Sequence, residues 1–457
     1  MMQARLNSII SKQWPFWAGG LFVGLAEILY YYHYNDFIGV TTGFAQMYAV
    51  SEKHIFHLDW VGRVYEPGIH WVILGAILGA RLVALGEKEL RGWVQYRWQM
   101  LLMSFMGGFL FSLGTRFAKG CTTHHFIGGL SSMSISSWVV LFSGIPFAFL
   151  AFKFAIWTGM GGYFRHQETW EIAKRYHQDP DQPQPGYNPD YNPRRDPLRW
   201  FLNIFFVTFL LVPLYFALFT NEIVGGISDM GWNNILWLFG PGLLFGIGIA
   251  KCGFGTECAV MSPEAALTTP ALYRAGGVPI ATYRMFRSTL PLQGFMVAIV
   301  IFNLFILASW LTGHGRIPNA AGSQGLYWGH ILGGPMLAMG AVFMIGCEVR
   351  TYARLGLGYA TALAALPGFY FGYLPYTFFK EQIDAVAFGH GLTRFTTVPK
   401  WAAGTLGGTE VAWSIVYSLL LIGILIFSFE GGRRFLQTSL GNLLRSNTDE
   451  LVYSPVR

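Results

Sequence analysis

The sequence has few charged residues, few cysteines and no nucleotide-binding loop. Only 12% of its 457 residues are charged, against roughly 25% in soluble domains. The four cysteines, Cys121, Cys252, Cys258 and Cys347, lie in apolar surroundings and do not form the disulfide framework of a secreted protein. No stretch matches the Gly-x4-Gly-Lys-Ser/Thr pattern, so nothing indicates an ATP-driven pump. The net charge of +7 does not indicate nucleic-acid binding, because the basic residues cluster in predicted loops.

Hydrophobic residues and glycine dominate instead. The chain is 53% hydrophobic with 56 glycines, and its mean hydropathy is +0.41. Because a membrane helix needs about 20 apolar residues, we predict an all-α integral membrane protein. About ten spans are expected, some of them short re-entrant or half-helices where glycine interrupts the run. The predicted spans are about 14–34, 69–86, 101–119, 137–160, 199–221, 238–258, 287–312, 329–347, 357–378 and 411–429.

A proline-rich stretch divides the chain into two membrane halves. Residues 182–193 contain repeated prolines, which cannot sustain a helix. We therefore expect an N-terminal half (1–164), a polar linker (165–198), a C-terminal half (199–430) and a polar tail (431–457). Most Lys and Arg residues fall on one side of this arrangement, which predicts that both termini are cytoplasmic.

One glycine-rich stretch occurs twice. Residues 107–121 align without a gap with residues 333–347, and both copies end in Gly-Cys. The similarity could be chance between two glycine-rich apolar helices. We interpret it as an internal repeat, which predicts two pseudo-symmetric halves. On the expected topology the two copies run in opposite directions, as in the inverted repeats of many transporters.

Three of the four cysteines are candidate substrate ligands. Cys121 and Cys347 end the glycine-lined repeats, and Cys258 follows a third glycine-rich run. Neutral thiols can offer weak S–H donors to an anion, and an apolar setting favours the neutral form. The alternative is that all three are packing residues. Cys252 is interpreted as an inert core residue.

His124 and His125 follow Cys121 by three and four residues. On a helix they would share a face with it, so a Cys/His metal site is one alternative. A structural histidine, or a donor to substrate at a pore mouth, is favoured because no fourth ligand is evident.

Several charged residues flank the cysteines. Ionisable groups inside a membrane protein indicate function, although some can lie at the interface with their charge in water. Arg116 or Lys119 could attract an anion, whereas a glutamate would oppose one unless paired or protonated. The other flanking charges are Lys251, Glu257, Glu348 and Arg350.

These motifs carry a resemblance to the YeeE/YedE family of bacterial inner-membrane proteins, whose characterised members import thiosulfate. Residues 39–45 are similar to its Gly-Ile-Ser-Thr-Gly-Phe segment, and 114–125 to its first Gly-Cys motif. Residues 129–131 and 346–358 match further family segments, and Cys258 resembles the cysteine of an Arg-Phe-Cys segment. The departures from the family pattern are His124, Glu257, Glu348 and Arg350.

The resemblance implies a relay of thiols, from Cys121, Cys258 and Cys347, that passes a small sulfur-containing anion without covalent change. His124, His125 and Arg116 are further expected substrate-binding residues. The expected function is a permease for thiosulfate or a related sulfur compound in the bacterial inner membrane. We expect no enzyme activity, cofactor or metal. Candidate partners are the bilayer, a cytoplasmic sulfur-carrier protein and other membrane subunits.

Two other functions stay open. The first is a membrane-anchoring subunit of a redox or sulfur-processing complex, with no transport of its own. The second is a membrane enzyme that uses Cys121, His124 and His125 as a metal site.

Overall fold

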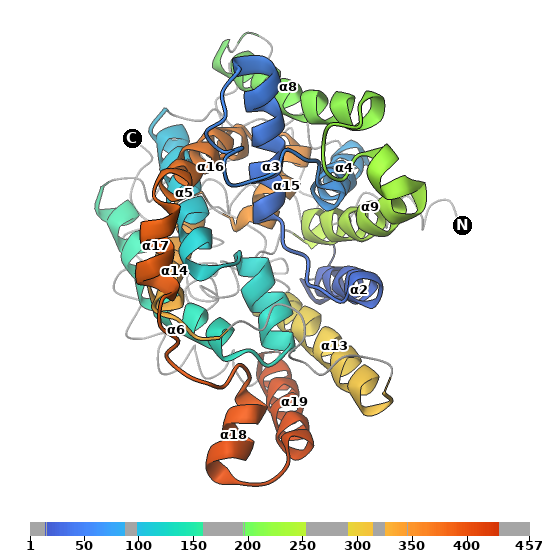
Figure 1. Cartoon of the computed structure of the whole chain (residues 1–457), viewed down its shortest axis with the longest axis vertical. Coiled ribbons are helices and arrows are strands. Elements are labelled where there is room, and N and C mark those ends of the chain that lie inside the picture. The colour runs from blue at the N-terminus through green and yellow to red at the C-terminus, as the bar shows by residue number, and fades with distance from the viewer. Residues whose placement is uncertain are drawn as a thin grey trace, which may run out of the picture.

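The computed structural model describes residues 14, 16–86, 98–158, 195, 197–252, 291–313, 325–344 and 346–428, and these form a bundle of helices (Figure 1). Within them, β-pairing is limited to isolated bridges. The helices are α2 (Phe16–Tyr34), α3 (Thr41–Ser51), η1 (Glu52–Phe56), α4 (Trp71–Gly86), α5 (Trp98–Ala118), η3 (Thr123–Gly129), α6 (Ile135–Trp157), α8 (Pro197–Phe219), α9 (Ile227–Cys252), α13 (Pro291–Leu311), α14 (Trp328–Phe343), α15 (Glu348–Leu357), α16 (Ala360–Phe378), α17 (Lys380–Phe388), α18 (Val398–Leu406) and α19 (Glu410–Ile426).

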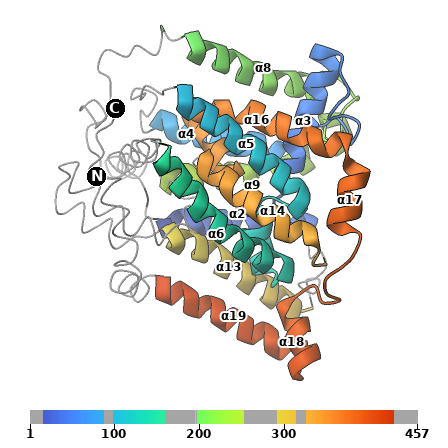
Figure 2. The same cartoon turned by 90° about the vertical axis from the view of Figure 1, so that its left-hand side faces the viewer.

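The long helices lie side by side, with α8 and α19 at opposite edges of the bundle (Figure 2). Their outer surface carries large apolar side chains, among them Phe142, Leu236 and Leu420, each more than half exposed. Such a surface suits contact with lipid. The protein is therefore a multi-pass membrane protein, as the composition predicts.

Among the described helices, four segments are long and apolar enough to cross a membrane: Trp98–Ala118, Ile227–Cys252, Leu292–Leu311 and Trp328–Leu357. The last of these combines α14 with the short helix α15. Shorter apolar helices are Trp71–Leu85, Ile135–Ala151, Val207–Phe219 and Glu410–Ile426. All eight overlap predicted spans. The total of about ten spans stays a prediction.

The two glycine-rich repeats pack directly on each other. A Cβ placed on Gly107 of α5 would lie 2.8 Å from the carbonyl oxygen of Gly340 of α14. One on Gly333 would lie 2.8 Å from the carbonyl oxygen of Gly114. Residue numbers therefore rise along α5 as they fall along α14, so the two helices are antiparallel. Glycine is needed at this crossing because the backbones approach too closely for a side chain.

Each repeat helix also packs on the long helix that comes after the other repeat and the short helix following it. Gly108 of α5 lies against the Ala365 carbonyl of α16, and the aligned Gly334 of α14 lies against the Val140 carbonyl of α6. A two-fold relation between the halves would exchange the α5–α16 contact with the α14–α6 contact, so these four helices are arranged as two related halves would be. Pseudo-symmetry over the whole chain stays a prediction.

The predicted halves interleave. Helix α5 of the N-terminal half contacts α14 and α16 of the C-terminal half, and α2 contacts α9 and α13. The proposed boundaries stay predictions, because almost all of the 165–198 linker and all of the 431–457 tail lie outside the described residues.

Two short helices, α3 and α15, begin inside the bundle. All ten residues of α15 are buried, and α15 packs against α16 and against α4 and α9 (Figure 1). Its Arg354 is held inside the bundle by two hydrogen bonds, donating from Nη1 to the Met344 carbonyl at 2.9 Å and from Nη2 to Thr361 Oγ1 at 2.8 Å. A short helix with buried charges needs protein rather than lipid around it, in agreement with the half-helices predicted from glycine interruptions.

Candidate functional site

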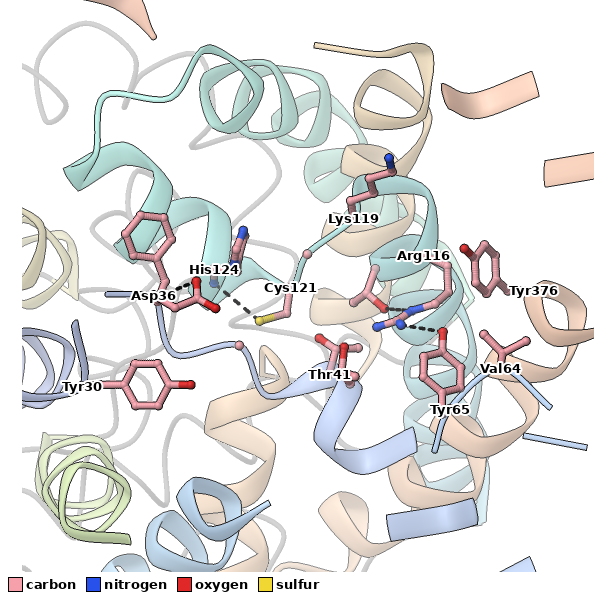
Figure 3. Close-up of a pocket in the computed structure, with 15 residues that line it drawn as sticks. Tyr30, Asp36, Thr41, Val64, Tyr65, Arg116, Lys119, Cys121, His124 and Tyr376 are labelled. Carbon is pink, nitrogen blue, oxygen red and sulfur yellow. Dashed lines mark hydrogen bonds between the residues drawn. The ribbon is translucent and has the colours of Figure 1, made fainter. Parts of the chain in front are cut away.

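A pocket of about 400 Å³ opens between the end of α5 and the start of α3. Figure 3 shows Cys121 in its centre, between Asp36 and His124 on one side and Thr41 and Arg116 on the other. The pocket is therefore built from five places in the chain: the end of α2 with the turn that follows, the start of α3, the loop before α4, the end of α5 with the start of η3, and α16. The lining residues are Tyr30, Asp36, Phe37, Gly39, Thr41, Thr42, Val64, Tyr65, Thr115, Arg116, Lys119, Gly120, Cys121, His124 and Tyr376.

Cys121 reaches the pocket because α5 ends two residues before Gly120. Lys119 has a left-handed backbone with φ of 54°, which turns the chain away from the helix axis. Gly120 then passes under two histidine rings; a Cβ on it would lie 2.7 Å from Cδ2 of His124 and 2.9 Å from Nε2 of His125. Glycine is thus required before the cysteine by this close approach.

The Cys121 thiol is buried and hydrogen-bonded to the backbone. Its sulfur accepts a hydrogen bond from the backbone N–H of His124 at 3.5 Å. The residue is 1% exposed and lies between the end of α5 and η3, outside the spanning helices. Burial, reinforced by the nearby Glu348 carboxylate, raises the pKa of this thiol above its usual value. The thiol therefore stays protonated at neutral pH and can donate its S–H.

Arg116 is the fixed positive charge of the pocket. Its Nη1 donates to the Tyr65 hydroxyl at 2.6 Å, and its Nε donates to Thr115 Oγ1 at 3.1 Å. The guanidinium carbon lies 5.2 Å and 5.3 Å from the ring centres of Tyr65 and Tyr373. The two ring centres are 6.1 Å apart, so both rings contact the guanidinium from neighbouring directions and restrict its movement. Because the group has five N–H donors, these two bonds leave capacity for an anion.

Glu348 lies behind the pocket, where α3 and α15 begin. Thr41 lines the pocket and donates from Oγ1 to Glu348 Oε2 at 2.8 Å. The glutamate is 0% exposed, and Cys347 precedes it as the N-terminal cap of α15. The two short helices thus meet end to end through a hydroxyl and a carboxyl group.

The predicted site residues fall into three groups. Cys121, Arg116 and His124 line one pocket. His125 and Cys347 are buried and are not among the lining residues. His125 makes hydrogen-bonding contacts with the Ala118 carbonyl at 2.8 Å and Ser137 Oγ at 3.2 Å, and Cys347 caps α15. Cys258 lies outside the described residues. What each of them does in binding stays a prediction.

Sequence reasoning missed the aromatic neighbours of Arg116. Tyr65 comes from the loop before α4 and Tyr373 from α16, and neither belongs to a motif. Thr41 lies within the 39–45 segment that carried the family resemblance, so its position could have been flagged. Across the described residues, His, Cys, Asp and Glu form no group of three or more that could hold a metal ion.

The membrane helices interleave, and two half-helices meet at a buried charged site. This architecture is typical of transporters. Residues 2–146, about a third of the chain, match the family model described as sulphur transport. This match confirms the YeeE/YedE resemblance over the N-terminal third of the chain. The matched segment includes Thr41, Arg116, Cys121 and His124 but ends before Cys347. Neither the curated proteins nor the solved structures gave a match.

Proposed function

We propose that the protein is a permease that moves thiosulfate, or a similar small sulfur anion, across the bacterial inner membrane. One observation carries this proposal: a fixed cation, Arg116, and a neutral thiol, Cys121, line the same pocket. A cation attracts the oxyanion end of such a substrate, and a thiol can donate a weak hydrogen bond to its sulfur or oxygen.

The pocket offers a graded entry for an anion. Lys119 also lines it, with its ammonium group 4.0 Å from the ring centre of Phe388. Lys119 is exposed, so its charge attracts anions from solution, and the rings of Tyr327 and Phe388 hold the ammonium group in place. With both termini cytoplasmic, as the basic residues predict, α2 and α5 run outward and the pocket opens on the outer side. Import is the direction that this orientation supports.

Beyond the pocket, the route continues past the Thr41–Glu348 contact toward Cys347. Cys121 and Glu348 are close enough to interact, and Cys347 is the residue before Glu348. A substrate that leaves Cys121 would therefore meet the Cys347 region next, with Cys258 as the third proposed thiol. Weak S–H donors suit this passage, because each step must bind the anion without holding it.

Uptake into liposomes tests the proposal. Labelled thiosulfate would be supplied to purified, reconstituted protein, with sulfate and selenite as competitors. Cys121→Ala, Cys258→Ala and Cys347→Ala should each depress uptake while leaving the yield of folded protein unchanged. Cys252→Ala is the matched control, because that thiol bonds to the Gly248 carbonyl of its own helix and should be dispensable.

The outcomes separate the competing functions. Normal uptake in all three variants would defeat the thiol relay. Absence of any thiosulfate transport, together with co-purification of stoichiometric partner proteins, would favour the anchoring-subunit alternative. Metal found in the purified protein would favour the enzyme alternative.

A further inference from the structure

The Glu348 carboxyl group occupies a position that an anion would also favour. It lies in the first turn of α15 and accepts a hydrogen bond from Thr41, the first residue of α3. Helix N-termini present unpaired N–H groups and partial positive charge. Arg116 adds a full positive charge that interacts with the carboxyl group. An ionised Glu348 therefore occupies a place that suits a bound anion, because the helix N-terminus and the Arg116 charge that stabilise it would also stabilise a substrate anion.

The carboxyl group is incompletely satisfied. Glu348 is 0% exposed, and its Oε1 has no partner at hydrogen-bond geometry among the described residues. The Tyr352 hydroxyl and the Cys121 thiol lie close enough to interact with it. A buried acceptor without a full set of donors makes the ionised form costly. Protonation would relieve that cost and give the carboxyl group a donor of its own.

The other ionisable groups around Glu348 come from several elements. Tyr352 lies on its own helix, Tyr48 on α3, Arg116 on α5 and Tyr373 on α16, and the Cys121 thiol follows α5. Of these groups, Arg116 alone carries a charge at neutral pH. Helix α15 itself adds two buried arginines, Arg350 and Arg354; Arg354 donates to the Met344 carbonyl and to Thr361 Oγ1.

Helices α4 and α9 also pack against α15. Arg81 of α4 donates to the Gly356 carbonyl near the far end of α15, at 3.4 Å. Lys251 of α9 lies over the Trp14 ring. Two carboxyl groups lie near the pocket. Asp36 lines it and is exposed to solvent, whereas Glu348 is buried and is the carboxyl group whose charge water does not screen from a substrate anion.

We infer that Glu348 is the proton-binding residue of an anion–proton symport, so that the sulfur anion enters the Arg116–Cys121 pocket together with a proton on the Glu348 carboxyl group. This inference rests on the proposed transport function. The proton comes from the side on which the pocket opens, with the Thr41 hydroxyl as the link between pocket and carboxyl group. On release, anion and proton leave on the opposite side and the carboxylate re-forms. A dianion carried with one proton moves a net single negative charge.

Gradient-driven accumulation tests this coupling. Wild-type protein is reconstituted in liposomes, and the membrane potential is held at zero with K⁺ and valinomycin. Labelled thiosulfate is then followed with and without an inside-alkaline gradient of about one pH unit. We expect up to about tenfold accumulation for one coupled proton, because one pH unit is a tenfold change in proton activity. Without the gradient, the internal concentration should only equal the external one.

Two glutamine variants locate the proton. Glu348→Gln keeps the shape but cannot take up a proton; it should lose the gradient response and retain exchange of internal for external thiosulfate. Glu52→Gln is the matched control. Glu52 is also buried, but it accepts from the Val61 N–H at 2.8 Å and from Tyr370 Oη at 2.6 Å, outside the pocket. This variant should respond to the gradient as the wild type does.

A measurement on the wild type alone covers the case in which Glu348→Gln does not fold. In weakly buffered detergent solution, thiosulfate binding should be accompanied by uptake of up to about one proton per bound anion, because the pKa of a carboxyl group rises when an anion binds nearby. Binding without proton uptake over the range from pH 5 to pH 9 would overturn the inference.

The failures are distinguishable. Wild-type protein that exchanges thiosulfate but ignores the pH gradient overturns the coupling and leaves the permease proposal standing. A folded Glu348→Gln variant with an undiminished gradient response does the same. Absence of exchange under every condition overturns the proposed function itself, and the coupling with it.

Discussion

The two repeat helices, α5 and α14, are both followed by a Gly-Cys pair, where the helix is interrupted. We call these two points the breaks after α5 and α14, and the chain continues differently after each. Each glycine-lined helix ends in Gly-Cys, and both cysteines are 1% exposed. After Cys121 the chain forms η3, which carries His124 and His125 and no acidic residue. After Cys347 it forms the regular helix α15, which begins with a buried glutamate. Cys121 lines the pocket, and Cys347 lies behind it.

This difference separates two tasks that one repeat unit can perform. The shared part, glycine and cysteine, brings the backbones together and places a thiol at a helix break. The part that differs sets the charge: neutral groups follow Cys121, whereas Glu348 follows Cys347. An entry site needs a net positive environment for an anion, while a coupling site needs a group whose charge can change. The two breaks thus place a cysteine thiol, Cys121 or Cys347, in two different electrostatic settings.

Breaking the shared part should have the largest effect. A Cβ on Gly340 would lie 2.5 Å from the Phe111 nitrogen and 2.7 Å from the Gly107 carbonyl oxygen. These are backbone atoms that cannot rotate away, so Gly340→Leu should cost about 3 kcal/mol or more and prevent folding. Size-exclusion chromatography of the fluorescently tagged protein should show no monodisperse peak.

Gly423→Leu on α19 is the control for that variant, because nothing lies within 4 Å of a Cβ placed there. It should elute like the wild type. A monodisperse Gly340→Leu protein would mean that α5 and α14 do not cross as described.

Removing the cation should affect the Cys121 side next most strongly. Arg116→Ala leaves the Tyr65 hydroxyl without its donor and removes the fixed positive charge of the pocket. In the complex, Arg116 and the thiosulfate anion would form a buried charged pair. Truncating one member of such a pair costs about 2 kcal/mol or more, so thiosulfate affinity should fall at least about 30-fold. Arg63→Ala is the matched control, since Arg63 is exposed and lies over Phe378 outside the pocket. Equal uptake by both variants would contradict the proposed role of Arg116.

Much of the shared part could be predicted from the sequence. The gap-free alignment of 107–121 with 333–347 indicates a repeated unit, and the structure brings Gly107 to Gly340 and Gly114 to Gly333. Glycine spacing is a local signal of close helix contact, so it survives without any knowledge of the fold. Arg116 and His124 are predictable for a similar reason, because they flank a Gly-Cys motif.

The partners that give these residues their setting could not be predicted. Tyr65 and Tyr373 meet Arg116 from the loop before α4 and from α16, so their contacts depend on tertiary packing and leave no periodic pattern. The contact of Glu348 with Thr41 likewise requires two half-helices to meet end to end. From the sequence, Glu348 was one of several flanking charges, and its burial against α3 is what distinguishes it.

The two adjacent histidines sharpen the comparison within the first break. His125 contacts the Ala118 carbonyl and Ser137, and burial lowers its pKa well below the usual value, so it is neutral. His125→Ala would leave a cavity and unpaired polar groups, which should cost about 2 kcal/mol of stability. A thermal unfolding assay should show a clearly lowered midpoint.

His124→Ala should show the opposite pattern. The His124 ring lines the pocket, so thiosulfate affinity should fall by severalfold while the unfolding midpoint changes less than in His125→Ala. A larger loss of stability in His124→Ala than in His125→Ala would reverse the assignment of a binding role to the first histidine and a packing role to the second.

Removing a single hydroxyl group gives the smallest expected effect and isolates the orientation of the cation. Tyr65→Phe keeps the ring 5.2 Å from the Arg116 guanidinium but removes the oxygen that accepts its hydrogen bond at 2.6 Å. Loss of one hydrogen bond to a charged group is worth about 1 kcal/mol, so thiosulfate affinity should fall about fivefold. Tyr370→Phe, which loses a hydrogen bond to Glu52 outside the pocket, should leave affinity unchanged. If Tyr65→Phe instead bound thiosulfate more tightly, the hydroxyl would be competing with the anion for the guanidinium, and the hydrogen bond would restrain the cation rather than orient it.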